Sequence, residues 1–367
     1  MMDVSFNTRL RILMIANSWM VVLVSELWNP WETSDASFPT KGDSSDKFRF
    51  LLNYAILAPS SHNSQPWLFN IVGDEIELYA DRRRALPAVD PHDRELITSC
   101  GTALFHLQVA LHHFGYSGRV RTFPRADDPD LLTSVGFGDR RNPSEEDEVL
   151  FRTIPKRRTN RMSFEQRPIP IDLLASLESA AKKEGAWLHV LRDESRRGKV
   201  ADLVAEGDRV QMASASFRRE LAAWIHPNRG VSHDGMPAYS MGMSGFGSGL
   251  APLIVRTFDV GKGQAAKDRQ LATGSPVLAL LGSETDAPSD WLDAGRALAH
   301  VLLLARASEV WASFLNQPIE VPELRTKLRN ELNVGGFPQL LLRMGYGADV
   351  KPTPRRTPGE ILMRPLR

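Results

Sequence analysis

The chain has 367 residues, of which 42% are hydrophobic, and this length favours two structural units with sizeable cores. Its 45 basic and 44 acidic residues leave a net charge of +1, which excludes a strong overall field for nucleic acid or an anionic membrane. The single cysteine, Cys100, excludes an internal disulfide and a cysteine-based zinc site, and its apolar surroundings indicate a core thiol.

Residues 1–46 are predicted to be an N-terminal apolar segment followed by a linker. The apolar run at 12–28 follows two arginines and has about the length of a short membrane span, but polar residues interrupt it. A membrane anchor, a degenerate signal sequence and a helix packed on the body all stay open. We therefore expect the protein in the cytoplasm, or associated with a membrane through this run. The polar stretch at 29–46 is the predicted linker.

A first unit is predicted over residues 47–150. Its hydrophobic pattern predicts a helix that stops at Pro59, a strand pair around a Gly-Asp turn, a long buried helix that ends at Gly115, and a further strand. In chain order these elements are expected at 46–58, 67–72, 75–80, 94–116 and 118–124. The polar stretch at 138–148 is predicted to be a boundary.

A second unit, over residues 151–367, repeats this order. Trp187 begins a predicted strand as Trp67 does, and Gly295 stands in a long helix where Gly101 stood. His300 and His106 likewise match and are predicted to pack between helices. Two copies are too few for a solenoid but suit an intrachain pseudo-dimer, in which one chain supplies both faces of an interface.

The spacing between these landmarks is longer in the second unit, which predicts an insertion at about 192–270. Within it, the run from Asp234 to Gly249 sets glycines beside methionine, tyrosine and phenylalanine. Such a run is typical of a supple segment that covers a flat ring and excludes water. An ordinary surface excursion is the other interpretation, and both stay open.

The two units are complementary in their polar motifs. The first has a loop that offers short polar groups after Pro59, namely Ser60, Ser61, Asn63 and Gln65. The second lacks this loop but opens on cations that can fork onto a phosphate, at Arg157, Arg158 and Arg161, with the Thr159 hydroxyl among them. A second basic pair, Arg355 and Arg356, follows near the end. Each half of a site occurs once, so we expect a single site per chain.

Other classes of chemistry are not indicated. The sequence has no G-x-S-x-G elbow, no histidine pair at zinc spacing and no G-x-G-x-x-G loop. We therefore expect no metal site and no protein nucleophile. The short basic runs are separated along the chain, so nucleic acid is not an expected partner.

The chain resembles the nitroreductase family of FMN enzymes from about residue 47 to 358. The segments that carry the resemblance are APSSHNSQPW at 58–67, IPKRRTNR at 154–161, GGFPQLLLRMGYG at 335–347 and PTPRR at 352–356. The fused two-copy form is similar to the Acg-like branch. The resemblance implies an α+β, nitroreductase-like fold with two tandem copies, and a monomer acting as a pseudo-dimer.

The resemblance also implies roles for the motif residues. Those in the opening cluster would hold phosphate, ribityl or the pyrimidine edge, those in the loop would face the flavin, and the last pair would close on the phosphate. These sets are Arg157, Thr159 and Arg161; Pro59, Ser60, Ser61 and Asn63; and Arg355 and Arg356. Many relatives use a glycine-containing segment near flavin N5, and the stretch here, at 312–320, has no glycine.

The implied function is that of an FMN-dependent NAD(P)H oxidoreductase. It would reduce a nitroaromatic, quinone or similar small-molecule acceptor by two electrons through bound FMN, with NAD(P)H as a transient reductant. The alternative is a protein that stores or sequesters FMN with little turnover. The physiological acceptor and the choice between NADH and NADPH stay open.

Overall fold

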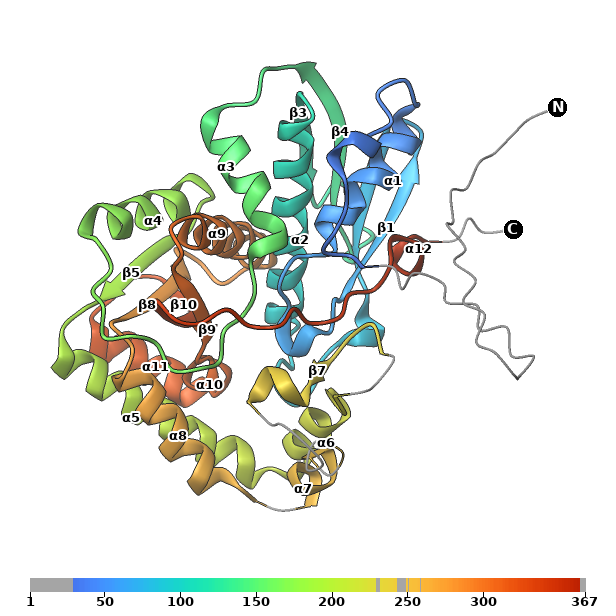
Figure 1. Ribbon diagram of the computed structural model, residues 1–367. Helices are drawn as coiled ribbons and strands as arrows, with labels where there is room; N and C mark the ends of the chain where they lie inside the picture. Colours follow the sequence, from blue (N-terminus) through green and yellow to red (C-terminus); the bar gives the residue numbers. More distant parts are fainter. Residues whose placement is uncertain (1–28, 229–231, 243–248, 250, 258, 364–367) are drawn as a thin grey trace, which may run out of the picture.

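The computed structural model describes residues 29–228, 232–242, 249, 251–257 and 259–363. The apolar run at 12–28 lies outside these residues, so its predicted fates stay predictions. No described helix combines the length and the apolar character that crossing a bilayer requires. The described strands form two four-stranded antiparallel sheets and one short two-stranded sheet, with helices packed between and around them (Figure 1).

The first sheet follows the order β1-β2-β4-β3 and packs with two helices of the same half. The helices are α1 (Ser44–Ala55) and α2 (Arg94–His113), and the strands are β1 (Trp67–Val72), β2 (Glu75–Ala80), β3 (Tyr116–Thr122) and β4 (Leu131–Arg140). Asp43 caps α1 by accepting a hydrogen bond from the Asp46 amide at 2.8 Å. Gly73 supplies the positive φ that the β1–β2 turn requires.

The second sheet follows the order β5-β8-β10-β9, so its strands take the same first-second-fourth-third order along the chain. Its strands are β5 (Trp187–Leu191), β8 (Val277–Ser283), β9 (Trp311–Phe314) and β10 (Phe337–Gly345). The helices that accompany it are α4 (Ile171–Lys183), α9 (Pro288–Ala307), α10 (Gln317–Glu320) and α11 (Pro322–Leu332). A central apolar strand, β8, is buried along its whole length.

The long helices α2 and α9 pack against each other between the two sheets. Gly101 and Gly295 meet at their crossing. A Cβ on Gly101 would collide with the Leu292 carbonyl, and one on Gly295 with the Thr98 carbonyl. Only glycine allows two helix backbones to approach this closely. The contact is reciprocal, because each glycine faces the carbonyl three residues before the other.

Apolar side chains form separate clusters around the two sheets, and the first cluster also takes in Leu292 and Leu303 of α9. One gathers Phe48, Trp67 and Leu104 around the first sheet, and another gathers Leu177, Leu281 and Leu342 around the second. Cys100 is fully buried in the first cluster and unpaired, which confirms the predicted core thiol.

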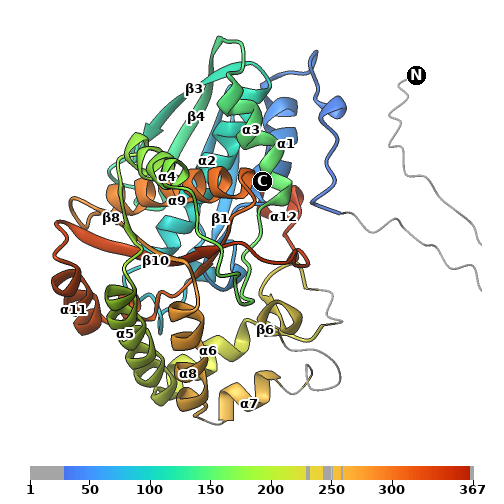
Figure 2. The same cartoon turned by 60° about the vertical axis from the view of Figure 1, so that its left-hand side comes forward.

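Between β5 and β8 the chain makes a helical excursion on one side of the molecule (Figure 2). It consists of α5 (Glu194–Ala213), α6 (Ala215–Ala223), β6 (Ile225–His226), β7 (Met236–Pro237), α7 (Ala251–Thr257) and α8 (Gly261–Thr273). Helices α5 and α8 pack along each other, and α5 also contacts α10. Through the contact between α5 and α10, this segment packs against the half that contains the second sheet.

Two local predictions need correction. The sequence pattern missed β4, and the polar stretch at 138–148 is not a plain boundary, since it contains the end of β4 and the start of α3 (Glu145–Thr153). Ser144 and Asp147 close a capping box that begins α3. The chain ends, within the described residues, in the short helix α12 (Pro358–Ile361) beside β1.

Candidate functional site

A cavity of about 480 Å³ lies where the two halves and the helical excursion meet. The loop after α1 contributes Pro59, Ser60 and Ser61, and the segment after α3 contributes Thr159 and Arg161. These motifs stand about 100 residues apart in the sequence (159 − 59), and the structure brings them to one cavity. The remaining lining comes chiefly from α2, α5, α8, β9 and α10.

The loop that follows Pro59 has an unusual backbone. His62, Asn63 and Gln65 all have positive φ, near +50°, which non-glycine residues rarely adopt. The loop is held by Ser60, whose hydroxyl accepts from the Gln65 amide at 2.9 Å, and by Ser61, which donates to Glu95 at 2.6 Å. Strain that the surroundings maintain in this way is common where a ligand is bound.

His62 lines the cavity, although the sequence prediction passed over it within the same motif. Its Nε2 is buried without a hydrogen-bond partner. Burial, with the nearby charge of Arg161, lowers the pKa of His62 to about 4, so the imidazole is neutral at pH 7. A neutral ring that faces a cavity can offer one donor or one acceptor to a ligand.

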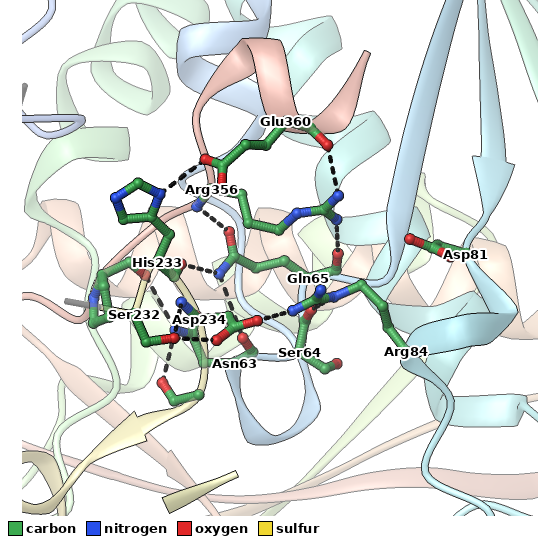
Figure 3. A network of polar contacts seen from close by, with 12 residues as sticks. Asn63, Ser64, Gln65, Asp81, Arg84, Ser232, His233, Asp234, Arg356 and Glu360 are labelled. Atoms are coloured by element: carbon green, nitrogen blue, oxygen red, sulfur yellow. Dashed lines mark hydrogen bonds and ion pairs between the residues drawn. The ribbon is translucent and has the colours of Figure 1, made fainter. Parts of the chain in front are cut away.

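Other predicted site residues lie outside the cavity lining and bind one another (Figure 3). Arg355 donates to the Asn63 side chain at 2.8 Å. Arg356 donates to the Gln65 carbonyl at 2.9 Å, and its amide donates to the Gln65 side chain at 2.8 Å. The two motifs therefore meet through hydrogen bonds that join the C-terminal segment to the loop, and the predicted contact of Arg355 and Arg356 with a phosphate stays a prediction.

Buried cations form a cluster behind this loop. Arg157 and Arg355 are each 3% exposed, and both donate to the Leu57 carbonyl, at 3.3 and 3.5 Å. Neither pairs with a carboxylate among the described residues, and their Nε atoms have no partner there. Burial lowers the pKa of Arg157 to about 10, with a contribution from Arg158. Burial and the charge of Arg157 lower the pKa of Arg355.

Two neighbours enclose this arginine cluster. Trp31, from the predicted linker, places its ring 4.9 Å from the Arg355 guanidinium and 5.6 Å from that of Arg158. His106 of α2 has a buried Nε2 without a partner, and burial and then the charge of Arg157 lower its pKa to about 3. Arg158 is paired with Asp349 at 3.4 Å, but a neutral imidazole and an aromatic face supply no negative charge to Arg157 and Arg355. This is the electrostatic environment of an anion site.

The predicted covering segment, from Asp234 to Gly249, falls partly on residues 243–248, which lie outside the described part. Its described portion lines the cavity through Met236 and Met241. Asp234 is ion-paired with Arg84 of the first half, and the Gly235 carbonyl accepts from Asn63 at 2.9 Å (Figure 3). The excursion is thus fastened across the cavity to the loop of the other half.

The cavity also has an acidic wall that the sequence prediction missed. Asp208, Asp268, Glu95 and Glu320 all line it. Within the described residues, no group of three or more histidine, cysteine or acidic side chains could hold a metal ion. The acids lie on four different helices and far apart along the chain, so no local motif marks them.

No protein-family model matches the chain. A Mycobacterium tuberculosis protein named Putative NAD(P)H nitroreductase is 33% identical over 336 residues, covering 90% of this chain and 95% of its own. Another from that organism, Putative NAD(P)H nitroreductase acg, is 27% identical over 321 residues and covers 85% and 93%. Among solved structures, an FMN- and NADPH-dependent nitroreductase from a Sphigopyxis species is 20% identical, with a TM-score of 0.40, over 59% of this chain and 98% of that one.

Proposed function

This chain belongs to the NAD(P)H nitroreductase family of oxidoreductases, and on that premise we propose that it binds one FMN and passes two electrons from NAD(P)H to a small-molecule acceptor. The acceptor class is a nitroaromatic, a quinone or a similar compound. One observation carries the proposal. Arg157 and Arg355 are buried without a carboxylate partner among the described residues, and Thr159, two residues after Arg157, lines the cavity, which suits an anionic cofactor.

The arginine cluster is the proposed phosphate end. Moving an unpaired charge out of water is costly, so a buried guanidinium is normally paired. A phosphate dianion would supply the missing acceptors for the Nε atoms of Arg157, Arg158 and Arg355. Thr159 follows Arg157 and Arg158 in the sequence and lines the cavity, so its hydroxyl would bind the phosphate or the ribityl chain. Pairing would also remove the repulsion between the two buried cations.

The cavity is the proposed ring end. A volume of about 480 Å³ falls within the range of cofactor sites and exceeds what a few waters need. Arg161 would face the pyrimidine edge, while Pro59, Ser60 and Ser61 would face the ring from the other half. Apolar lining from the excursion, such as Phe217, Leu221 and Met236, would exclude water from it. Asn63, Gln65 and Arg356 would act by holding this frame together.

We propose further that the two halves are tandem copies, about 47–150 and 151–367, which pack as a pseudo-dimer within a monomer. The shared strand order and the reciprocal glycine contact support this interpretation. The position equivalent by the pseudo-twofold rotation, around His300, has different charged groups. There His300 contacts Glu184 at 3.3 Å and Glu146 at 3.2 Å, where its counterpart His106 lies beside cations. The cations at that position, Arg296 and Lys183, are already ion-paired with these carboxylates, so one site per chain is expected.

Bound FMN would supply the chemistry, accepting hydride from the reduced nicotinamide and passing it to the acceptor. The protein's own contribution is binding, orientation and exclusion of water. No side-chain nucleophile is required, and the neutral His62 adds a hydrogen-bonding group rather than a charge. The proposed roles therefore depend on position and not on covalent catalysis.

The absorption spectrum of the purified protein tests the proposal directly. We expect a flavin band that bleaches when NADPH is added without oxygen and recovers when a quinone follows. Mass spectrometry of the released cofactor would identify it as FMN. Protein that is folded, lacks flavin as purified and does not take up added FMN would contradict the proposal.

The second candidate function is storage of FMN without turnover. It is favoured by the fastening of the excursion across the cavity, through the Asp234–Arg84 ion pair and the hydrogen bond from Gln65 to the His233 carbonyl at 2.9 Å. A cover held in place would keep NAD(P)H from the ring. Bound flavin that stays oxidised with excess NADPH would support storage over catalysis.

A further inference from the structure

Two buried carboxyl groups lie together in the wall that the excursion adds to the cavity. Asp208 of α5 is 3% exposed and Asp268 of α8 is 8% exposed, and both line the cavity. The Gln317 side-chain amide bridges them, donating to Asp208 Oδ1 at 3.1 Å and to Asp268 Oδ2 at 2.9 Å. Gly207 makes this possible, since a Cβ there would lie 2.7 Å from the Gln317 Cβ.

Two ionised carboxylates would need more hydrogen-bond donors than the surroundings of this pair supply. Asp268 Oδ2 receives a second bond from the Gln264 amide at 2.9 Å, but Asp208 Oδ2 is buried with no partner in the described structure. A buried carboxylate oxygen without a donor is costly. A proton held between the two carboxyls would satisfy this oxygen and halve the buried charge.

The charged groups around the pair do not contact its carboxyl oxygens directly. Those that face it from the neighbouring elements are Arg209 of α5, Lys267 of α8, Glu320 of α10, Arg343 of β10 and Arg161. Arg343 does not bind the pair, because its guanidinium donates to the carbonyls of Met162 and Asn160, at 3.0 and 3.2 Å. Within the described residues, none of these cations forms an ion pair with either carboxylate, so they do not force both acids to ionise.

The titration of the pair agrees with this geometry. Burial, followed by the charge of Asp268, raises the pKa of Asp208 to about 7. Burial also raises the pKa of Asp268. Because the two groups are in contact, they titrate as a unit and not as separate acids. The unit therefore keeps a proton to a higher pH than an exposed aspartate does.

We propose that the Asp208–Asp268 pair is the proton donor for the acceptor that this cavity reduces, an inference that rests on the proposed function. Reduction of a quinone consumes one hydride and one proton: NAD(P)H + quinone + H⁺ gives NAD(P)⁺ + hydroquinone. Reduction of a nitro group to a nitroso group consumes the same pair and releases water. The hydride comes from the reduced nicotinamide, and the proton passes from the carboxyl pair to the acceptor oxygen. Solvent then restores it.

The proton itself is measurable without turnover. Infrared spectra of the purified protein at pH 6 should show the carbonyl stretch of a protonated carboxylic acid. Isotope-edited difference spectra of Asp208→Asn and Asp268→Asn should each lose this band. The matched control is Asp202→Asn, also on α5, whose carboxylate is 64% exposed and pairs with Arg269 at 2.6 Å. The control should keep the band.

Stopped-flow measurements then separate the two halves of the reaction. Reduction of the flavin by NADPH needs hydride alone, whereas transfer to a quinone needs the proton. We expect the oxidative half-reaction of the wild type to slow as pH rises through about 7. In Asp208→Asn it should be slowed roughly a hundredfold at pH 6 and lose that pH dependence, as expected for removal of a general acid.

Each outcome decides one point. A protein whose flavin is never reduced refutes the proposed function, and the infrared band still reports on the pair. If the flavin is reduced but Asp208→Asn and Asp268→Asn transfer to quinone as fast as Asp202→Asn does, the pair is not the donor. Burial also raises the pKa of Glu320 and of Asp90, so the shared proton itself is overturned if neither variant loses a carboxylic-acid band that Asp202→Asn keeps.

Discussion

Replacement of Arg157 by methionine should change two properties in opposite directions. Methionine is long enough to fill much of the buried site, but it carries no charge. The hydrogen bond that is lost, to the Leu57 carbonyl, is long at 3.3 Å, and Arg355 still donates to that carbonyl. The unloaded protein should therefore gain stability while FMN binding weakens.

The size of each effect can be worked out. Burial lowers the pKa of Arg157 from 12.5 to about 10, which corresponds to a cost of about 3 kcal/mol for keeping the charge in the fold. Below pH 10 the guanidinium is protonated in both the folded and the unfolded states, so the whole cost applies at neutral pH. A charge-assisted hydrogen bond to phosphate contributes ~1.5–3 kcal/mol, so its loss weakens FMN binding about ten- to a hundredfold.

Calorimetry of the flavin-free protein and a fluorescence titration with FMN measure the two effects. The matched control is Arg152→Met, one turn earlier, whose side chain is 74% exposed and contacts Glu148 at 3.3 Å. Neither property should change much in the control. If Arg157→Met lowers the melting temperature of the flavin-free protein, or binds FMN as tightly as the control, the account of an unpaired cation awaiting an anion is wrong.

Three further outcomes are expected. Gly295→Ala should lower the free energy of unfolding by several kcal/mol because its Cβ meets a backbone carbonyl, whereas Gly263→Ala, which faces open space in α8, should be neutral or slightly stabilising by denaturant titration. Asp234→Asn should loosen the fastening to Arg84 and speed anaerobic flavin reduction by NADPH while FMN stays bound; an unchanged rate would remove the main support for storage. Cys100 should resist alkylation in the folded protein, since burial raises the pKa of its thiol, and rapid labelling by iodoacetamide would contradict its position.

Many of the helices and strands can be predicted from the sequence because hydrophobic periodicity and turn residues act locally. The repeated tryptophans and glycines stand at structurally matching points, and Gly101 and Gly295 meet at the helix crossing. Strand β4 was missed because Gly136 and Gly138 interrupt its alternation. The structure explains one of them, since a Cβ on Gly138 would collide with Ser117 beside the register shift of β3.

In the candidate site, too, the sequence predicts the local motifs but not the contacts between distant segments. The polar loop at 58–67 and the basic run at 154–161 are each contiguous in the sequence, so residue types alone indicated them. The direct bond between Asn63 and Arg355 joins residues 292 positions apart and depends on how the C-terminal segment returns to the loop. Asp208 and Asp268 lie on different helices that carry many exposed charges, so their burial becomes evident only when α5 packs on α8.

The central claim is that one chain makes one FMN site from two complementary halves. The most direct measurement is the amount of FMN released on denaturation, divided by the protein concentration, after saturation with FMN and removal of the excess. The account predicts a ratio of one, because at the equivalent position Arg296 and Lys183 are already paired with Glu184 and Glu146, whereas Arg157 and Arg355 have no carboxylate partner among the described residues. A ratio of two, or no retained FMN at all, would contradict it.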